Sequence, residues 1–225
     1  MKKRSIAIDG PSGAGKSTIA KLLAEELNFL YVDTGAIYRT VGLFAKREGA
    51  DPENVQQVVS LLKRIEITMD YGADGLQHMY LNGEDVTHAI REHIISDYAS
   101  KVSAMAEVRA FLMDMQRELA RKHDVIMDGR DIGTAVLPEA DLKLFLTATP
   151  EDRARRRCDD LRERGQQADY ETILRDVIDR DERDINRDAS PLRQADDAIL
   201  VDTTGEVLEK SLEKLRTIVK ERLGA

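Results

Sequence analysis

The residues with the clearest chemical potential form a glycine-rich segment near the start of the chain. The segment reads Gly10-Pro11-Ser12-Gly13-Ala14-Gly15-Lys16-Ser17 and matches the phosphate-binding pattern G-x-x-x-x-G-K-[ST]. Glycines let backbone N–H groups approach phosphate oxygens, and the N-terminus of a following helix adds a positive potential. We expect Lys16 to reach the β- and γ-phosphates of a nucleotide and the Ser17 hydroxyl to bind Mg²⁺. The alternative is a glycine-rich turn between a strand and a helix that holds no ligand.

Phosphate-binding loops of this kind occur in GTPases, motor ATPases and small kinases, and the rest of the sequence separates these classes. Asp202-Thr203-Thr204-Gly205 matches the D-x-x-G switch of GTPases, but it lies close to the C-terminus and the chain has no N-K-x-D motif. We interpret it as a turn from a strand to a helix. The chain is too short for a motor ATPase with its partner domains. A small ATP-using kinase therefore fits best.

Two further polar segments follow predicted strands and could bind a phosphate acceptor. Residues 33–39 (Asp-Thr-Gly-Ala-Ile-Tyr-Arg) offer hydroxyl, phenol and guanidinium groups, and the alternative is that Asp33 only caps the start of a helix. Residues 128–131 (Asp-Gly-Arg-Asp) place Asp128 at a strand tip, where a carboxylate can orient Mg²⁺ or its waters. Arg130 and Asp131 would project into the same cleft, unless this loop only caps the next turn.

The basic residues from Asp152 to Arg187 are all arginines. One guanidinium group can donate two parallel hydrogen bonds to the oxygens of a phosphate, which suits a nucleotide site. Arg180, Asp184 and Arg187 have the spacing of one helix face, and we expect this face to be partly shielded because it lies beside an apolar stripe of residues 174, 178 and 185. The acidic residues are equally dense here, so a salt-bridged helical surface is the alternative.

The elements that must position these groups show an alternation of strands and helices. Short apolar runs predict buried parallel strands at Ser5–Ile8, Leu30–Val32, Val125–Met127, Leu142–Leu146 and Ile199–Val201. Amphipathic patterns predict helices at Ser17–Leu27, Glu107–Lys122 and Val207–Leu223, together with a helix that starts at Thr149-Pro150. This order predicts an α/β fold with a doubly wound, five-stranded parallel sheet, which binds ligands at the carboxyl ends of its strands.

Residues of about 65 to 95 break the pattern. Residues 65–71 alternate at period two, and Met79-Tyr80-Leu81 leads into Asn82-Gly83, a strong hairpin signal. We expect a small inserted antiparallel sheet here, beside a helix at Asn54–Leu62.

Composition excludes several classes of protein. The chain of 225 residues carries a formal charge of −8, so it is not a general polyanion-binding surface, and no nucleic-acid partner is expected. The single cysteine, Cys158, allows no intrachain disulfide and is interpreted as a packing thiol. No apolar run approaches the ~18 residues of a membrane-spanning helix, and Met1-Lys2-Lys3-Arg4 is followed by no signal-peptide core. The sequence predicts a cytoplasmic protein without membrane contact, and a monomer.

The motifs together resemble those of the bacterial cytidylate kinases. The resemblance rests on the phosphate-binding loop, on residues 33–39, on Asp-Gly-Arg-Asp-Ile-Gly at 128–133 and on Arg-Asp-Glu-Arg-Asp-Ile-Asn-Arg at 180–187, and it covers essentially the whole chain. It implies one kinase unit over residues 1–225. The core would comprise about 1–40 and 105–225, an NMP-binding insert about 41–104, and a mobile lid about 153–170.

The resemblance also implies roles for individual residues. The ATP-binding set would be Gly10, Pro11, Ser12, Gly13, Ala14, Gly15, Lys16, Ser17 and Thr18, with the lid residues Arg153, Arg156 and Arg157. The CMP-binding set would be Thr34, Tyr38, Arg39, Ser100, Arg109, Arg130, Asp131, Arg180, Asp184 and Arg187. Catalysis would rest on Lys16, Arg130, Arg180 and Arg187, and Mg²⁺ on Ser17, with Asp128 acting through water.

These roles imply an ATP-dependent kinase that converts CMP and dCMP to CDP and dCDP in pyrimidine metabolism. Asp131 would accept a hydrogen bond from the cytosine amine, while Ser100 and Arg109 donate to the ring acceptors. Uracil has an oxygen in place of the amine and would be rejected. The alternative hypotheses are a kinase for another small acceptor and a nucleotide-sensing or RNA-binding module without turnover.

Overall fold

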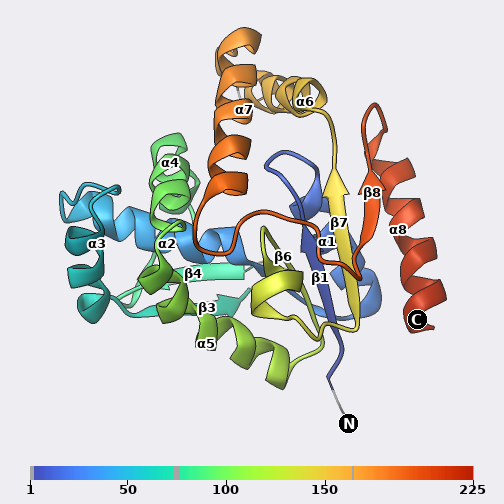
Figure 1. Ribbon diagram of the computed structural model, residues 1–225, viewed down its shortest axis with the longest axis horizontal. Helices are drawn as coiled ribbons and strands as arrows, with labels where there is room; N and C mark the ends of the chain where they lie inside the picture. The colour runs from blue at the N-terminus through green and yellow to red at the C-terminus, as the bar shows by residue number, and fades with distance from the viewer. Residues whose placement is uncertain (1–2, 73–76, 164, 225) are drawn as a thin grey trace. The chain divides into compact units, whose positions relative to one another are not determined.

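The computed structural model describes residues 3–72, 77–163 and 165–224, which form two β-sheets and their surrounding helices (Figure 1). The larger sheet has the strand order β2-β6-β1-β7-β8, and the smaller has the order β3-β4-β5. The strands of the larger sheet are β1 (Ser5–Asp9), β2 (Leu30–Asp33), β6 (Val125–Gly129), β7 (Leu142–Thr147) and β8 (Ile199–Asp202). Those of the smaller sheet are β3 (Ile67–Tyr71), β4 (Gln77–Leu81) and β5 (Glu84–Asp85).

The larger sheet is parallel, as the apolar runs predict. β1 pairs with β6 on one side and with β7 on the other, and β7 pairs with β8. β1 is therefore the central strand, with β6 and β2 added on one side of it and β7 and β8 on the other. Loops that follow β1 and its neighbours leave the sheet at one edge, where ligands bind in folds of this class. The α/β prediction with five parallel strands is confirmed.

Helices make most of the connections between the strands. The α-helices are α1 (Lys16–Leu27), α2 (Thr34–Arg47), α3 (Val55–Leu61), α4 (His93–Val102), α5 (Ala106–Lys122), α6 (Pro150–Glu163), α7 (Tyr170–Asn186) and α8 (Leu208–Leu223). Two short 3₁₀ turns lie at Leu62–Arg64 and Ala89–Arg91, and a π-helical turn, η3, spans Ile132–Val136. The helices predicted from periodicity are all present within two residues of their predicted ends.

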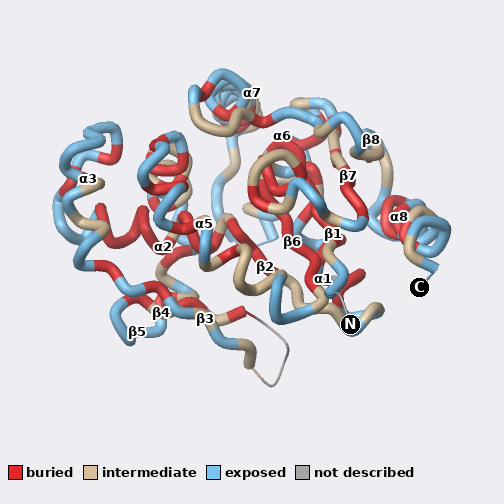
Figure 2. The backbone as a smooth tube through the Cα atoms, turned by 60° about the horizontal axis from the view of Figure 1, so that its bottom comes forward, coloured by how far each residue is buried: buried red, intermediate tan, exposed pale blue. Residues whose placement is uncertain are grey.

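The main core lies between the sheet and the helices α1 and α8. Ile19 and Leu23 of α1 and Leu215 of α8 are buried against Ile8 of β1 and Leu144 of β7. Figure 2 shows β1, β6 and β7 of this sheet as largely buried backbone and parts of α8 as exposed. This apolar contact fixes α1, and the start of α1 is the end of the phosphate-binding loop.

The small sheet forms as the hairpin signal predicts. β4 pairs with β3 and β5 in antiparallel fashion, and β4 is joined to β5 by Asn82-Gly83. Both turn residues have positive φ, 50° and 83°, which is the conformation that Asn-Gly turns adopt between strands. Met79 and Leu81 of β4 are buried, and β4 packs against α2.

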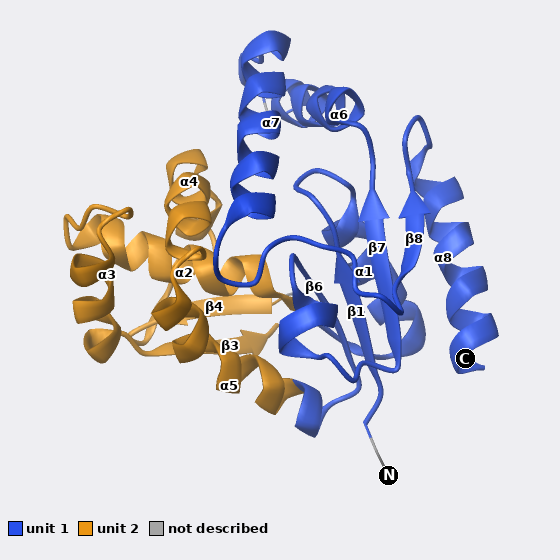
Figure 3. Ribbon diagram, in the orientation of Figure 1, with its two compact units in different colours: residues 1–31, 120–225 blue, residues 32–119 orange. Residues whose placement is uncertain are grey.

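The chain divides into two compact units (Figure 3). Unit 1 comprises residues 1–31 and 120–225, and unit 2 comprises residues 32–119. The insert predicted at about 41–104 falls within unit 2. Over the ranges that the structure describes, none of the helices has the length and apolarity needed to cross a membrane.

Candidate active site

The glycine-rich loop of unit 1 connects the last residue of β1, Asp9, to the first residue of α1, Lys16. Gly10 has a φ of 144°, and a Cβ built on it would lie 1.9 Å from the carbonyl oxygen of Leu146 in β7. A residue with a side chain cannot occupy this position without displacing the neighbouring strand. The loop passes close to β7 because Gly10 has no side chain, so packing alone requires a glycine at the first position of the pattern.

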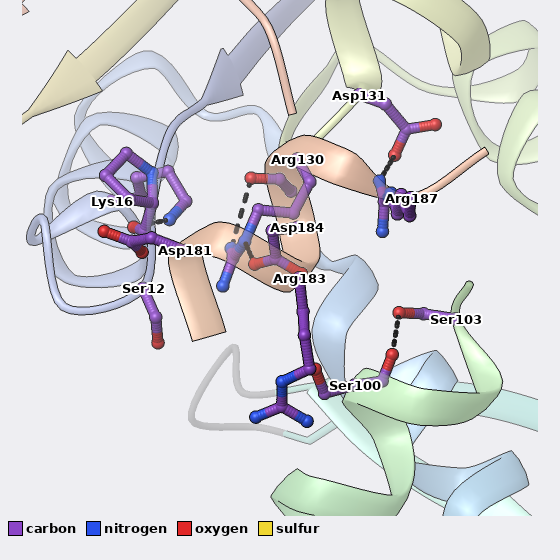
Figure 4. Close-up of polar contacts among 12 residues, drawn as sticks. Ser12, Lys16, Ser100, Ser103, Arg130, Asp131, Asp181, Arg183, Asp184 and Arg187 are labelled. Atoms are coloured by element: carbon purple, nitrogen blue, oxygen red, sulfur yellow. Dashed lines mark hydrogen bonds and ion pairs between the residues drawn. The ribbon is translucent and has the colours of Figure 1, made fainter. Parts of the chain in front are cut away.

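Lys16 lies inside this loop rather than in solvent. Its side chain is buried, and Nζ donates a hydrogen bond of 2.7 Å to the carbonyl oxygen of Pro11 (Figure 4). Burial and the positive charge of Arg130 lower the pKa of Lys16 to about 7, against the opposing effect of Asp128. An anionic ligand in the loop would restore the charged form. The loop is thus electrostatically suited to phosphate.

Asp128 at the end of β6 is held by two hydroxyl groups. Ser17 Oγ donates to Oδ2 at 2.7 Å, and the Tyr31 phenol donates to Oδ1 at 3.0 Å. A serine hydroxyl beside a carboxylate is the oxygen donor set that Mg²⁺ prefers, with waters and phosphates completing its coordination. The residues present therefore fit Mg²⁺. The prediction that Asp128 lies at the tip of its strand is confirmed, and the structure adds its hydrogen bond to Ser17.

Two ion pairs connect the loop after β6 to the end of α7. Arg130 Nε lies 2.8 Å from Asp184 Oδ2, and Arg187 Nη2 lies 3.5 Å from Asp131 Oδ1 (Figure 4). Burial alone would raise the pKa of Asp184, but the charges of Arg130 and Arg180 lower it below its usual value. The side chains of Arg187 and Asp131 are each only 4% exposed. The structure thus brings five of the predicted residues together, of which Asp131, Asp184 and Arg187 are buried and Arg130 and Arg180 are half-buried.

The predicted apolar stripe on α7 is wrong for two of its three residues, while the third, Leu174, is partly buried and packs against the contact with α6. Ile178 and Ile185 are exposed, whereas Ile173 and Val177 pack against α6. The buried face continues at the same spacing to Arg180 and Asp184, so these two residues follow the apolar ones on one face. The helix was predicted about a quarter-turn away from its true orientation.

Arg187 also differs from the prediction, because it does not belong to the helix face of Arg180 and Asp184. α7 ends at Asn186, and Arg187 is the C-terminal cap, with extended backbone angles of φ −67° and ψ 141°. Its Nε donates to the carbonyl oxygen of Ser190. The surface alternative is wrong for Asp184 and Arg187, which are buried.

The arginines of α6 have different surroundings. Arg153 is 2% exposed, donates from Nε to the Ala148 carbonyl and from Nη1 to the Ser12 carbonyl at 3.0 Å, and pairs with Asp181 of α7. It therefore joins the phosphate-binding loop to the α6–α7 pair. Arg156 pairs with Asp152 and donates to the Thr203 carbonyl, and Arg157 is half-buried.

The surface salt-bridge alternative does describe other arginines of α6. Arg155 and Arg162 are more than 60% exposed and pair with Asp152 and Asp159. Cys158 is buried among Ala154, Ile173 and Val177, as expected for a packing thiol.

Unit 2 holds the remaining predicted residues. Asp33 caps α2 by accepting from the Ala36 N–H, and it also pairs with Arg39 and Arg91. The cap interpretation is therefore correct for Asp33, and the same carboxylate orients Arg39. Burial would raise the pKa of Asp33, but Arg39 and Arg91 lower it. Thr34 is buried at the first position of α2.

A second group in unit 2 surrounds Tyr38. The guanidinium carbon of Arg109 lies 5.4 Å from the centre of the Tyr38 ring, and Arg109 Nη1 donates to the Ser103 carbonyl. Ser103 Oγ in turn donates to the Ser100 carbonyl at 2.9 Å (Figure 4). Arg109, Ser100 and Tyr38 are therefore linked through one short chain of contacts.

Sequence reasoning missed three residues of this arrangement: Asp9, Tyr31 and Asp181. Asp9 ends an apolar strand with a charge immediately before Gly10, and Tyr31 lies within a predicted strand. In both cases a polar side chain lies directly beside a motif, which is a weak indication that it belongs to the site. Asp181 lies among equally acidic neighbours, and nothing in the pattern distinguishes it from them.

Residues 6–221 match the family model described as cytidylate kinase. The chain belongs to the cytidylate kinase family. The curated cytidylate kinase of Caldicellulosiruptor bescii is 49% identical over 227 residues, which cover 99% of this chain and 100% of that protein. The curated cytidylate kinase of Geobacter sulfurreducens is 47% identical over 217 residues, covering 96% and 93%.

The fold has a distant match among solved structures. A protein from Eubacterium ventriosum, titled as uncharacterized, superimposes with a TM-score of 0.55 and covers 98% of this chain and 100% of that one. At 14% sequence identity, this likeness concerns the fold alone. The family assignment thus rests on the sequence match.

Proposed function

We propose that this protein transfers the γ-phosphoryl group of ATP to a phosphate oxygen of CMP or dCMP, which forms CDP or dCDP. The observation that carries the proposal is the match of residues 6–221 to the cytidylate kinase family. The buried Lys16, the Ser17–Asp128 pair and the Arg130–Asp184 pair supply the charges that such a transfer needs.

ATP is assigned to the phosphate-binding loop. Its triphosphate would lie against the backbone N–H groups of residues 10–18, with Lys16 as the charged contact. Mg²⁺ would be held by Ser17 directly and by Asp128 through water, and when bound it neutralises charge on the phosphates. Asp128 also orients the Ser17 hydroxyl, since the two are hydrogen-bonded at 2.7 Å.

The lid assigned to residues 153–170 would contribute Arg153, Arg156 and Arg157. Arg156 and Arg157 are less buried than Arg153 and are the better candidates for direct contact with ATP. Arg153 would have to leave Ser12 and Asp181 to reach a ligand. Its role in the proposed enzyme is therefore to shape the loop.

CMP is assigned to the residues that the family resemblance implies for it. The phosphate would be held by Arg39, Arg130 and Arg187, with Thr34 and Tyr38 beside it, and the sugar by Arg180 and Asp184. Asp131 would accept from the cytosine amine, and Ser100 and Arg109 would donate to the ring acceptors. The ion pair between Arg187 and Asp131 supports this assignment, because Arg187 holds the buried Asp131 carboxylate in place.

The proposed reaction needs no general base. A phosphate monoester has a second pKa near ~6, so the attacking oxygen of CMP is largely anionic at neutral pH. Catalysis then rests on bringing two polyanions into line and neutralising their charge. Closure of the lid would exclude water and so limit ATP hydrolysis. We place this reaction in pyrimidine metabolism in the cytoplasm, carried out by a monomer.

The proposal is tested by the release of ADP from ATP and Mg²⁺ in the presence of a panel of acceptors: CMP, dCMP, UMP, AMP, GMP and none. Turnover confined largely to CMP and dCMP is the expected result. Turnover with a different acceptor would contradict the assignment of the base-reading residues. Binding of ATP without turnover on any acceptor would favour a nucleotide-sensing module instead.

A further inference from the structure

A buried carboxylate outside the residues assigned above connects the phosphate-binding loop to the loop after β6. Asp9 is the last residue of β1, and its side chain is almost entirely buried. Oδ1 accepts from the backbone N–H of Ile132 and Oδ2 from that of Gly133, both at 2.7 Å. The two oxygens therefore bind two successive N–H groups of a segment that is more than 120 residues away in the chain.

The two N–H groups belong to the first turn of the π-helical turn η3. The Asp131 carbonyl accepts from Ala135 and Val136, and the Ile132 carbonyl accepts from Leu137. The first N–H groups of a helical turn have no carbonyl acceptor within it and must find one elsewhere. Asp9 is that acceptor, so it caps η3 from a neighbouring strand. π-Helical turns are uncommon and occur often at functional sites.

Gly133 allows this contact to form. A Cβ built on Gly133 would lie 3.3 Å from Asp9 Oδ2 and 3.1 Å from Cδ of Lys143. Both distances are tighter than ordinary contacts, so a larger residue would push the turn away from the carboxylate. The contact between Asp9 and Gly133 thus fixes the path of the backbone immediately after Asp131.

The arrangement has a cost that favours a role beyond stability. Burial raises the pKa of Asp9 to about 6, although the two N–H groups oppose the rise. A buried anion of this kind stabilises a fold little, because its desolvation offsets its hydrogen bonds. What it provides is a defined direction for the backbone that carries Arg130 and Asp131.

We propose that Asp9 is a positioning residue that sets Arg130 and Asp131 relative to the phosphate-binding loop and so contributes to the choice of cytosine. The proposal rests on the proposed function, in which Asp131 accepts from the cytosine amine. Asp9 is joined directly to Gly10, and its two hydrogen bonds hold the segment that follows Asp131. It touches neither substrate in this assignment.

The test uses Asp9→Asn, which keeps the size of the side chain but turns one acceptor into a donor facing an N–H group. We expect kcat/KM with CMP to fall about 10- to 100-fold, as small misplacements of catalytic groups do. The ratio of CMP to UMP efficiency should fall as well, while KM for ATP changes little. Asp141→Asn is the matched control, because Asp141 is exposed and accepts from Ser5 N–H at the other end of β1. It should behave as the unchanged protein.

Hydrogen exchange provides a readout that does not depend on activity. The amides of Ile132 and Gly133 should be protected in the unchanged protein without ligand and exchange at least about tenfold faster in Asp9→Asn. Failure of the unchanged protein to phosphorylate CMP would contradict the proposed function. The exchange rates would still show whether Asp9 holds the turn at residues 132 and 133. If Asp9→Asn does not fold, Gly133→Ala takes its place, with a smaller effect in the same direction.

Two results would overturn the proposal. One is a folded Asp9→Asn protein with unchanged kcat/KM and an unchanged preference for CMP over UMP. The other is unchanged exchange at residues 132 and 133 in that variant, since the carboxylate then does not hold the turn.

Discussion

Lys16 and Arg130 lie close enough that the charge of Arg130 lowers the pKa of Lys16, and Lys16 is buried while Arg130 is half-buried. Two neighbouring cations are costly in a protein interior unless carboxylates lie nearby. Here Asp128, Asp9 and Asp184 provide the opposing charge. Such an arrangement contributes little to stability. Its benefit is that it places cations where a phosphate group can bind.

We expect Lys16→Met to remove turnover but not the fold. A methionine fills the buried space without a charge, so the melting temperature should be unchanged or higher. kcat should fall about 10²- to 10³-fold, because a charged donor to the transferred phosphoryl group is lost. The measurement is steady-state kinetics with a thermal melt. Lys21→Met, at an exposed position of the same helix, is the control and should change neither. Near-normal kcat in folded Lys16→Met would show that the loop does not act as assigned.

The role of Asp131 in recognising cytosine can be tested by a single substitution. Asp131→Asn presents an amide that can donate to the O4 of uracil but serves the cytosine amine poorly. The ratio of kcat/KM for CMP to that for UMP should fall at least about 100-fold, because a mismatched buried polar pair is strongly penalised.

The matched control for this change is Asp188→Asn, an exposed aspartate next to Arg187. It should leave the ratio as it is. If Asp131→Asn lowers the efficiencies for CMP and UMP by the same factor, then Asp131 does not read the base.

The helices and strands of the fold were largely predictable, because burial imposes simple periods on them. β1, β6 and β7 are continuous apolar runs since helices or strands cover both their faces, and their predicted bounds are right to within two residues. The Asn82-Gly83 turn was equally clear, because few residues accept its backbone angles.

The face of α7 was not predictable in the same way. Its residues alternate between apolar and charged so densely that two stripes a quarter-turn apart fit the sequence. Packing against α6 decides between them and buries Ile173 and Val177. The ion pair of Arg153 with Asp181 then lies between the two helices, and only the tertiary structure reveals it. The cap of η3 by Asp9 was beyond prediction for the same reason.

The tie between α6 and α7 leads to a prediction about stability. Asp181→Ala leaves the fully buried Arg153 without its carboxylate partner, and loss of one member of a buried pair costs about 3 kcal/mol or somewhat less here, since Asp181 is partly exposed. Urea unfolding should show this fall in the free energy of unfolding. Asp179→Ala, exposed on the same helix, should have almost no effect. Equal stability of the two variants would mean that Arg153 does not depend on Asp181.

Asp9 gives a pH dependence at the junction of β1 and η3. Its pKa is about 6 in the folded protein and 3.8 when unfolded, so between these values the folded state holds a proton that the unfolded state releases. Its contribution to the free energy of unfolding therefore increases as the pH falls from about 6 to about 4, by about 3 kcal/mol in total. Asp9→Asn lacks this contribution.

The measurement is the difference in unfolding free energy between the unchanged protein and Asp9→Asn at several pH values. Other carboxylates contribute equally to both proteins and cancel. The difference should shift in favour of the unchanged protein as the pH is lowered. Parallel curves would contradict the assigned pKa of Asp9.

At the scale of the whole molecule, charge is distributed unevenly. The chain has 42 acidic and 34 basic residues, a net charge of −8, yet its candidate site is lined by arginines and a lysine. Salt screens exposed charges beyond ~10 Å, so the overall charge matters less to a bound nucleotide than the cations around it. The net negative charge of the chain is thus compatible with a local cluster of cations at the candidate site.

The match to the family model over residues 6–221 includes residues of both compact units. The candidate residues for the triphosphate lie in unit 1, and several of those for CMP lie in unit 2. The individual motifs were sufficient to predict the family, whereas the roles of single residues are proposals that the kinetics must test.

The most direct test of the central claim is a competition between acceptors. The protein is given ATP and Mg²⁺ with equal concentrations of CMP and UMP, and the two diphosphate products are quantified during the first turnovers. The account predicts that CDP accumulates almost alone. Equal amounts of CDP and UDP, or a predominance of UDP, would contradict it.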